Sequence, residues 1–358
     1  MPGAANPVLA ERVARHGFIN RPARTVAQAA RLTTAIQAQD PGASRLGLRA
    51  RAREITERDV LRAIEQDRTV VRSWLMRATV HLVAADDVRW LTSVIGPSFA
   101  GKFRKRWLDL GLTPEVLQRT AAALPLLLAD GPKTRRAITA DLLEQGIGLD
   151  LTDPQTSSHI LLHATGIGMV CRGPDRGRDP TFALLDQWLP AAPGGPSGDE
   201  ALAELARRYF AAFSPATPAD FVTWSGLASS KAIALIRDEL TPAETDGHAG
   251  FTLGSVQPQR GLRLLSGFDN YLVGYRARAL FMDAEYRDRV YVGGVIRPTV
   301  LLDGSIVGTW RLTRAAKAAR VTVSMFSPPS RKVLLAIEDE VADIGAFIGL
   351  PADLAFRT

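Results

Sequence analysis

Two glutamines one residue apart, Gln37 and Gln39 in the stretch TTAIQAQDP, are the side chains whose type and spacing first suggest chemistry. An amide has an acceptor oxygen and a donor NH₂ group, so it can hold a water molecule and a sugar or phosphate oxygen together. An ordinary helix end with solvated glutamines is the alternative interpretation of this spacing. The rest of the chain decides between the two.

The glutamines close a segment with helical spacing. Residues 24–39 repeat their apolar side chains as a helix does, and Asp40-Pro41-Gly42 is typical of a helix end. Residues i and i+2 of a regular helix point about 200° apart. We therefore expect a distorted last turn in which both amides reach one face. Asp40 is either a turn residue that ends the helix or a carboxylate that orients water.

Three further polar residues follow in the stretch SWLMRATVHLV. Residues 69–77 look helix-like, and the alternation from Thr79 to Val83 predicts a strand. Thr79 and His81 share one face of that strand because their spacing is two. His81 is either packed and hydrogen-bonded or a side chain that reaches the amides. Arg77 is a candidate phosphate clamp.

Composition favours an intracellular protein that binds a polyanion. Lys and Arg outnumber Asp and Glu by 44 to 37, and the net charge is +7. Cys171 is the only cysteine, which excludes a disulfide framework and a cysteine zinc site. The N-terminus lacks an apolar signal core, and no apolar run approaches the roughly 20 residues of a membrane span. We expect a cytoplasmic protein with no membrane contact.

Local signals place the other elements. Thr56 and Asp59 form a capping box, and Thr113-Pro114 and Thr134 each begin a helix. Asp303-Gly304 between two alternating runs predicts a β-hairpin. His159 and His163 have the i, i+4 spacing of metal ligands, but nothing nearby completes the set, so we expect no metal.

The order helix, helix, turn, helix, hairpin recurs along the chain. It predicts an α+β fold of three tandem winged helix-turn-helix units with a C-terminal β-hairpin region. The expected units are residues 1–110 with the Gln-x-Gln motif, residues 111–195, and residues 196–358 with a β-rich C-terminal segment. The Gly- and Pro-rich residues 191–198 are the expected linker.

Such units place one helix in the major groove of DNA and a basic hairpin along its backbone. Single surface cations are usually only solvated, but several on repeated units favour phosphate contact. The candidate DNA-binding residues are Arg77, Arg135, Arg136, Arg172, Arg176, Arg178 and Lys231.

Four blocks of the sequence, TTAIQAQDP, SWLMRATVHLVAADD, LLSGFDNYLVGYRAR and GVIRPTVLLDGSIVGTWR, resemble the winged-helix DNA glycosylases, the family typified by AlkZ and YcaQ. The resemblance implies three tandem winged helices that form a concave, basic DNA channel. It also implies that Gln37 and Gln39 are the catalytic Gln-x-Gln motif of the AlkZ branch. The family often has glycine where Ala78 stands.

This resemblance, together with the amide pair, predicts the chemistry. An N7-alkylated guanine is already a cation and needs no acid to leave, so the enzyme has to hold water near C1′ and stabilise the oxocarbenium-like sugar. Neutral amides suffice for that task, with Asp40, Thr79 and His81 in possible support. We expect a monofunctional glycosylase without a cofactor.

The expected partner is double-stranded DNA with alkylated or crosslinked guanine, bound by a monomer. A crosslink that ties both strands cannot be flipped out whole, so a hairpin has to reach it from a groove. Residues 295–312 and the basic hairpin near Arg172–Arg178 are both candidates. The alternative function is a non-catalytic winged-helix DNA-binding or regulatory protein.

Overall fold

The structure is a computed structural model that describes residues 6–357 except 151–152, 154, 191–193 and 246. It has a mixed α+β fold whose described strands form sheets of six, five, two and two strands. Among the described helices, none combines the length and apolar character that a bilayer crossing requires. Part of the expected linker, residues 191–193, lies outside the described residues.

One order of elements, helix, short strand, two helices and two strands, occurs near the N-terminus and again in the middle of the chain. The first copy comprises α2 Val26–Arg31, β1 Ile36–Gln37, α3 Pro41–Arg49, α4 Glu57–Glu65, β2 Val70–Trp74 and β3 Val80–Ala84. The second comprises α7 Pro114–Leu127, β4 Lys133–Thr134, α8 Arg135–Glu144, α9 Thr156–Gly166, β5 Val170–Arg172 and β6 Thr181–Leu184.

A related order follows the linker. An isolated bridge between Ala216 and Phe251 stands where the earlier copies have a short strand. The elements are α11 Gly198–Phe213, α12 Pro218–Ser225, α13 Ser229–Leu235, β7 Leu240–Thr245 and β8 His248–Leu253.

The remaining elements connect these copies or form the C-terminal part. Among them are three short 3₁₀ turns, η1 Met76–Ala78, η2 Arg237–Glu239 and η3 Ala284–Tyr286. The helices are α1 Pro7–Arg15, α5 Ala85–Ile95, α6 Pro97–Asp109, α10 Leu185–Trp188, α14 Asn270–Val273, α15 Arg287–Val290 and α16 Arg331–Ile348. The strands are β9 Leu262–Leu265, β10 Tyr291–Val292, β11 Val295–Ile296, β12 Thr299–Leu302, β13 Ser305–Arg314, β14 Ala319–Met325 and β15 Ala352–Phe356.

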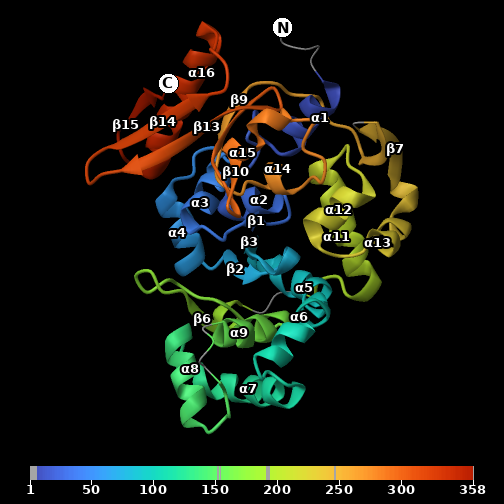
Figure 1. Ribbon diagram of the computed structural model, residues 1–358, viewed down its shortest axis with the longest axis vertical. Coiled ribbons are helices and arrows are strands. Elements are labelled where there is room, and N and C mark those ends of the chain that lie inside the picture. Colours follow the sequence, from blue (N-terminus) through green and yellow to red (C-terminus); the bar gives the residue numbers. More distant parts are fainter. Residues whose placement is uncertain (1–5, 151–152, 154, 191–193, 246, 358) are drawn as a thin grey trace.

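The first two copies share one sheet, in the order β1-β3-β2-β5-β6-β4. Strands β2 and β5 meet at Arg72 and Arg172. The Arg72 guanidinium also donates two hydrogen bonds of 2.8 Å to the Asp175 carboxylate in the β5–β6 loop. Figure 1 shows α7 and α8 at one end of the long axis and the C-terminal sheet with α16 at the other.

The C-terminal sheet, in the order β15-β14-β13-β12-β9, packs into one core with the first copy. Buried Arg49 of α3 fixes this contact, because its guanidinium donates to Glu340 at 3.1 Å and to Asp343 at 2.6 Å on α16. The motif-bearing copy is therefore held from both sides, by the shared six-stranded sheet and by the C-terminal layer.

Helix starts and the C-terminal hairpin agree with expectation. Thr56 and Asp59 form the capping box of α4. Thr113 caps α7, with Pro114 at its first position, and Thr134 caps α8. The hairpin β12–β13 turns at Asp303-Gly304, but Val295 and Ile296 pair with β10 instead of extending it.

Two expectations near the motif are wrong. The helix expected over residues 24–39 ends at Arg31, and residues 36–37 form strand β1. Thr34 has a left-handed φ of 69°, which breaks the helix, and the buried residues beyond it face a sheet partner. The helix-like run at residues 69–77 is strand β2 followed by η1. Val70 and Val71 are both buried, so β2 shows no alternation that would mark it as a strand.

Candidate active site

Gln37 lies on strand β1, which pairs with β3, and Gln39 lies in a bend just beyond that strand. Gln37 is opposite His81, and the Ala38 N–H donates to the Val80 carbonyl at 2.7 Å. The backbone ladder ends there, because the Val80 N–H donates to the Gln39 side chain. The expected distorted helix end is therefore the end of a strand, and a common face for the two amides stays a prediction.

Contacts from three parts of the chain hold Gln37. Its side chain is 6% exposed, its Oε1 accepts from Arg77 Nη2 at 2.9 Å, and its backbone N–H donates to Asn270 Oδ1 at 3.3 Å. Gln39 is exposed, and its Oε1 accepts from the Val80 N–H at 3.2 Å. The motif thus combines a fixed, buried amide with an exposed one.

Asn270 is a positioning residue that the sequence did not reveal in this role. Asp269 caps α14, and its neighbour, buried Asn270, contacts the motif segment. Its Nδ2 donates to the Ala35 carbonyl at 2.6 Å, while its Oδ1 accepts from the Gln37 N–H. One side-chain amide therefore binds the backbone of β1, and only the folded chain shows this contact.

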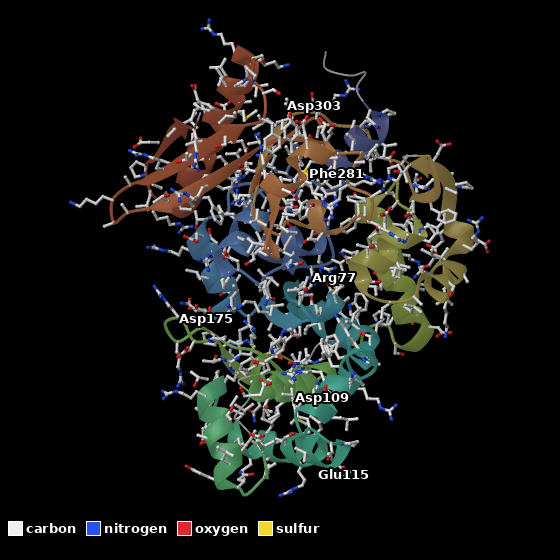
Figure 2. The ribbon with its side chains drawn as sticks, in the orientation of Figure 1. Arg77, Asp109, Glu115, Asp175, Phe281 and Asp303 are labelled. Atoms are coloured by element: carbon white, nitrogen blue, oxygen red, sulfur yellow. The ribbon has the colours of Figure 1, made fainter. Side chains whose placement is uncertain are left out.

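Arg77 and Ala78 form an unusual turn beside Gln37, with left-handed φ values of 59° and 61°. The Arg77 guanidinium donates to Gln37 Oε1 and to the Trp224 carbonyl of α12, and its own carbonyl accepts from Lys102 Nζ at 2.8 Å. Burial lowers the pKa of Arg77 to about 10, so it remains a cation at neutral pH. Its place in the middle of the molecule is seen in Figure 2.

His81 is buried and Thr79 is half-buried, and a supporting role for either in the reaction stays a prediction. His81 is 2% exposed, and its Nδ1 lies 2.9 Å from the Thr79 carbonyl, so Nδ1 carries the proton of the neutral ring. Burial and the Arg77 charge lower the pKa of His81 to about 3. Thr79 Oγ1 donates to the Met76 carbonyl at 3.0 Å. Both side chains stabilise the strand and turn beneath the amides.

Asp40 begins a helix, so the expectation that Asp40-Pro41-Gly42 ends one is wrong. Its carboxylate accepts from the Ala43 N–H at 3.0 Å and caps α3, with Pro41 at the first helical position. The residue is exposed beside Gln39. One oxygen of the carboxylate is thus committed to the cap, and a role in orienting water stays a prediction.

The candidate DNA-binding cations have different surroundings. Arg172 lies over the Trp74 and Phe182 rings, 5.0 and 5.7 Å from their centroids, and burial lowers its pKa to about 10. Arg176 and Arg178 are exposed in the β5–β6 loop, which also holds Asp175, labelled in Figure 2.

The remaining two positions lie on helices. Arg135 and Arg136 are exposed at the start of α8, and Arg135 Nη1 donates to Ser158 Oγ. Lys231 on α13 is exposed and forms an ion pair of 2.6 Å with Asp199. Arg172 is therefore a packed residue, while the other cations on the β5–β6 loop and on α8 face solvent.

The tip of the β12–β13 hairpin is not free to enter a groove. A Cβ on Gly304 would lie 2.5 Å from Leu9 Cβ of α1, and the Gly304 carbonyl accepts from Tyr271 Oη at 2.7 Å. Of the two candidate hairpins, the β5–β6 loop is the one with exposed arginines at its tip.

Cavities and metal clusters do not mark the site. A cavity of about 1200 Å³ lies among α5, α6, α7 and α9, and one of about 700 Å³ beside α12; neither is lined by a predicted site residue.

Within the described residues, no group of three His, Cys, Asp or Glu could hold a metal ion. His159 accepts from Trp107 Nε1 at 3.1 Å, and His163 packs edge-on to the same ring.

The family model described as DNA glycosylase AlkZ-like matches residues 30–347. The chain belongs to this family. AlkZ-like proteins are DNA glycosylases, and the sequence-based resemblance is confirmed. The chain is 27% identical over 303 residues to an interstrand DNA cross-link repair glycosylase of Streptomyces sahachiroi, covering 79% of this chain and 80% of that protein. The solved structure of the S. sahachiroi DNA glycosylase AlkZ is similar over 100% of both chains, with 25% identity and a TM-score of 0.82.

Proposed function

We propose that this AlkZ-like glycosylase hydrolyses the N-glycosidic bond of cationic N7-alkylguanine in duplex DNA, including guanine held in an interstrand crosslink. The observation that carries the proposal is the Gln37 and Gln39 pair at the end of β1, with the Gln37 amide held by the Arg77 cation. The name of the S. sahachiroi relative, an interstrand DNA cross-link repair glycosylase, supports the crosslink as substrate.

In the proposed reaction the C1′–N9 bond breaks and its electron pair leaves with the base, which neutralises the positive charge of the alkylated ring. Water forms the new bond to C1′ and releases one proton to solvent. The products are the free N7-alkylguanine and an abasic site. Neutral amides fit this reaction because the leaving group needs no proton, whereas an unmodified purine leaves poorly without an acid.

The recurring element order supports three tandem winged-helix units over residues 1–110, 111–195 and 196–358. We infer that they form one concave, basic channel for the duplex and act as a monomer. Exposed cations on α8 and on the β5–β6 loop would contact phosphates. A non-catalytic DNA-binding protein is not favoured, because the family consists of glycosylases.

We further propose a monofunctional hydrolase that leaves the abasic strand intact. A lyase would need an amine nucleophile, and Lys102, which lies beside the Arg77 turn, donates its Nζ to the Arg77 carbonyl. Borohydride in the reaction should trap no covalent complex with DNA, whereas a trapped complex would contradict this part of the proposal.

The test uses two duplexes, one with a single N7-methylguanine and one with a nitrogen-mustard crosslink between guanines. The purified protein should release the modified base from the first duplex and unhook the second, leaving abasic sites. Gln37→Ala with Gln39→Ala should abolish release and keep duplex affinity. The exposed Gln187 offers a control, because Gln187→Ala should change neither. Undiminished release by the double variant would contradict the assignment of the amides.

A further inference from the structure

A cavity of about 700 Å³ lies where α1, α12 and the β7–β8 hairpin meet (Figure 1). None of its lining residues belongs to the candidate active site. Its volume is within the usual range of pockets for small ligands, about 300–1,000 Å³. Much of the wall is apolar and includes Pro218, Ala249 and Leu280. The few polar groups of the cavity therefore determine which ligand it takes.

Arg12 of α1 supplies a fixed cation to this cavity. The residue is only 2% exposed. Its Nε and Nη2 donate to the Pro215 carbonyl at 3.1 and 2.7 Å, and Nη2 also donates to Thr245 Oγ1 at 3.0 Å. The guanidinium carbon lies 3.8 Å from the centroid of the Tyr275 ring. These contacts hold the guanidinium in one orientation and leave its Nη1 unused.

Arg12 Nη1 opens into the cavity. No atom of the described chain accepts a hydrogen bond from it, and it is not among the buried polar atoms that lack a partner. Since the rest of this residue is buried, solvent reaches Nη1 from the cavity that Arg12 lines. The charge has no ion pair among the described residues either, and nearby Glu11 binds Arg15 instead. A buried cation without a counter-ion is costly, and an anion in the cavity would reduce that cost.

Arg276 adds a second cation to the same cavity. It is exposed, and its side chain forms no hydrogen bond or ion pair with another described residue. Asp220 is the only carboxylate among the lining residues that the structure describes. Its Oδ1 accepts from the Arg276 backbone N–H at 2.7 Å and its Oδ2 from the Thr217 N–H at 2.9 Å. One carboxylate, already hydrogen-bonded to the backbone, thus faces two guanidinium groups.

We propose that this cavity binds a phosphate ester, with the phosphate held by Arg12 Nη1 and the Arg276 guanidinium. Guanidinium groups bind phosphate oxygens through charge-assisted hydrogen bonds. A bare phosphate leaves most of the volume empty, so the apolar wall is available to cover the sugar of a nucleotide. The nucleotide is either part of a bound duplex or free in solution, and both present the same chemical group. The site is separate from Gln37 and Gln39 and does not rest on the reaction proposed for them.

His248 reports binding at the cavity itself, because it is exposed and lines it. Protein with ¹³C-labelled histidine is titrated with inorganic phosphate and then with thymidine 5′-monophosphate, while chloride keeps the ionic strength constant and the pH is fixed. The His248 signal, assigned with His248→Gln, should shift and saturate with both probes. The nucleotide should saturate it at the lower concentration, since the wall covers its sugar. A wild-type signal that never saturates would overturn the site.

Two variants test the two cations. Arg276→Gln changes an exposed side chain, so it should leave the melting temperature unchanged and weaken phosphate binding about tenfold, the effect of losing one charge-assisted hydrogen bond. Arg12→Met should abolish binding, and its thermal unfolding is measured first because Arg12 also holds Pro215. If that variant does not fold, Arg276→Gln alone decides.

Arg311→Gln is the matched control. Arg311 is exposed on β13, which lies across the molecule from β7 in Figure 1, and the change removes the same charge. This variant should bind phosphate as the wild type does. Equal binding by Arg276→Gln and Arg311→Gln would overturn the assignment of Arg276 and with it the site.

A duplex arm identifies the source of the ester. If the cavity receives a backbone phosphate, an unmodified duplex should displace the nucleotide from the His248 site. Arg276→Gln should then reduce the log–log salt slope of duplex binding by about 0.9. If a free nucleotide is the ligand, the slope should stay unchanged and the nucleotide should bind equally with and without the duplex. Base release is not measured in any arm, so the outcome is independent of the proposed function.

Discussion

Gln37 lies directly opposite His81 across the β1–β3 pairing, so a buried imidazole supports the fixed amide of the motif from the neighbouring strand. The His81 ring hydrogen-bonds within its own strand, to the Thr79 carbonyl. Its low pKa, about 3, keeps the ring neutral in the folded protein throughout the physiological range.

His81 should make the fold sensitive to acid. The unfolded chain binds a proton at this histidine near pH 6.5, whereas the folded chain does so only near pH 3. Stability is therefore lost as the pH falls from 6.5 toward 3, by about 2 kcal/mol at pH 5. His81→Asn retains a donor for the Thr79 carbonyl and cannot titrate. Urea unfolding at pH 7.5, 6.5 and 5 should show a shallower loss in this variant; parallel curves would count against the assignment.

Ala78→Gly should stabilise the turn beside the motif. A left-handed alanine costs about 1–2 kcal/mol, and glycine removes that strain. The greater conformational entropy of glycine in the unfolded chain offsets about 0.5–1 kcal/mol of this gain. The expected net gain is about 0.5 kcal/mol by denaturant unfolding. Ala84→Gly is the comparison, because Ala84 is extended with φ −61°, and it should lose about 1 kcal/mol. Loss of stability in both variants would argue against strain at Ala78.

Asp269→Asn should strongly destabilise the protein. Arg51 and Asp269 form a bidentate pair with both side chains 0% exposed. Removing the carboxylate charge leaves a buried cation, which costs about 3–5 kcal/mol. Adding Arg51→Met should recover part of the loss. Glu54→Gln, in the exposed pair with Arg24, should cost less than about 1 kcal/mol by the same unfolding assay.

Arg176→Ala and Arg178→Ala should weaken duplex binding with little effect on folding. Both residues are exposed in the β5–β6 loop, and each lost phosphate contact should reduce the log–log salt slope of binding by about 0.9. Arg172→Ala should act differently, because its guanidinium packs over two aromatic rings. It should lower the melting temperature and leave the salt slope unchanged. Fluorescence anisotropy across salt concentrations measures the first effect.

Gly304→Ala should destabilise the packed hairpin tip more than Gly294→Ala. Both glycines have left-handed backbones, with φ of 92° and 82°. A Cβ added at position 304 would clash with Leu9, whereas a Cβ added at position 294 would have no neighbouring atom within 4 Å. The strain of a left-handed alanine, about 1–2 kcal/mol, is common to both, and only the first adds a clash. Equal melting temperatures would indicate that the tip is free of α1.

Sequence reasoning succeeded where structure is local. The capping box at Thr56 and Asp59 lies within four residues, and the Asp303-Gly304 turn carries its own signal. Strand β1 has two residues and exists through its pairing with β3, and the Gln37 N–H bonds to Asn270, 233 residues away. The backbone geometry at Gln37 and the partners of the motif could not be predicted from the sequence, because distant segments impose both.

The junction between β2 and β5 has a mechanical consequence. One continuous sheet, secured by Arg72 on the Asp175 carboxylate, spans two of the three repeated units. Those two units cannot swing toward each other without shearing backbone hydrogen bonds. In the proposed complex, a double helix that rests against both units would therefore have to bend to a protein surface that changes little.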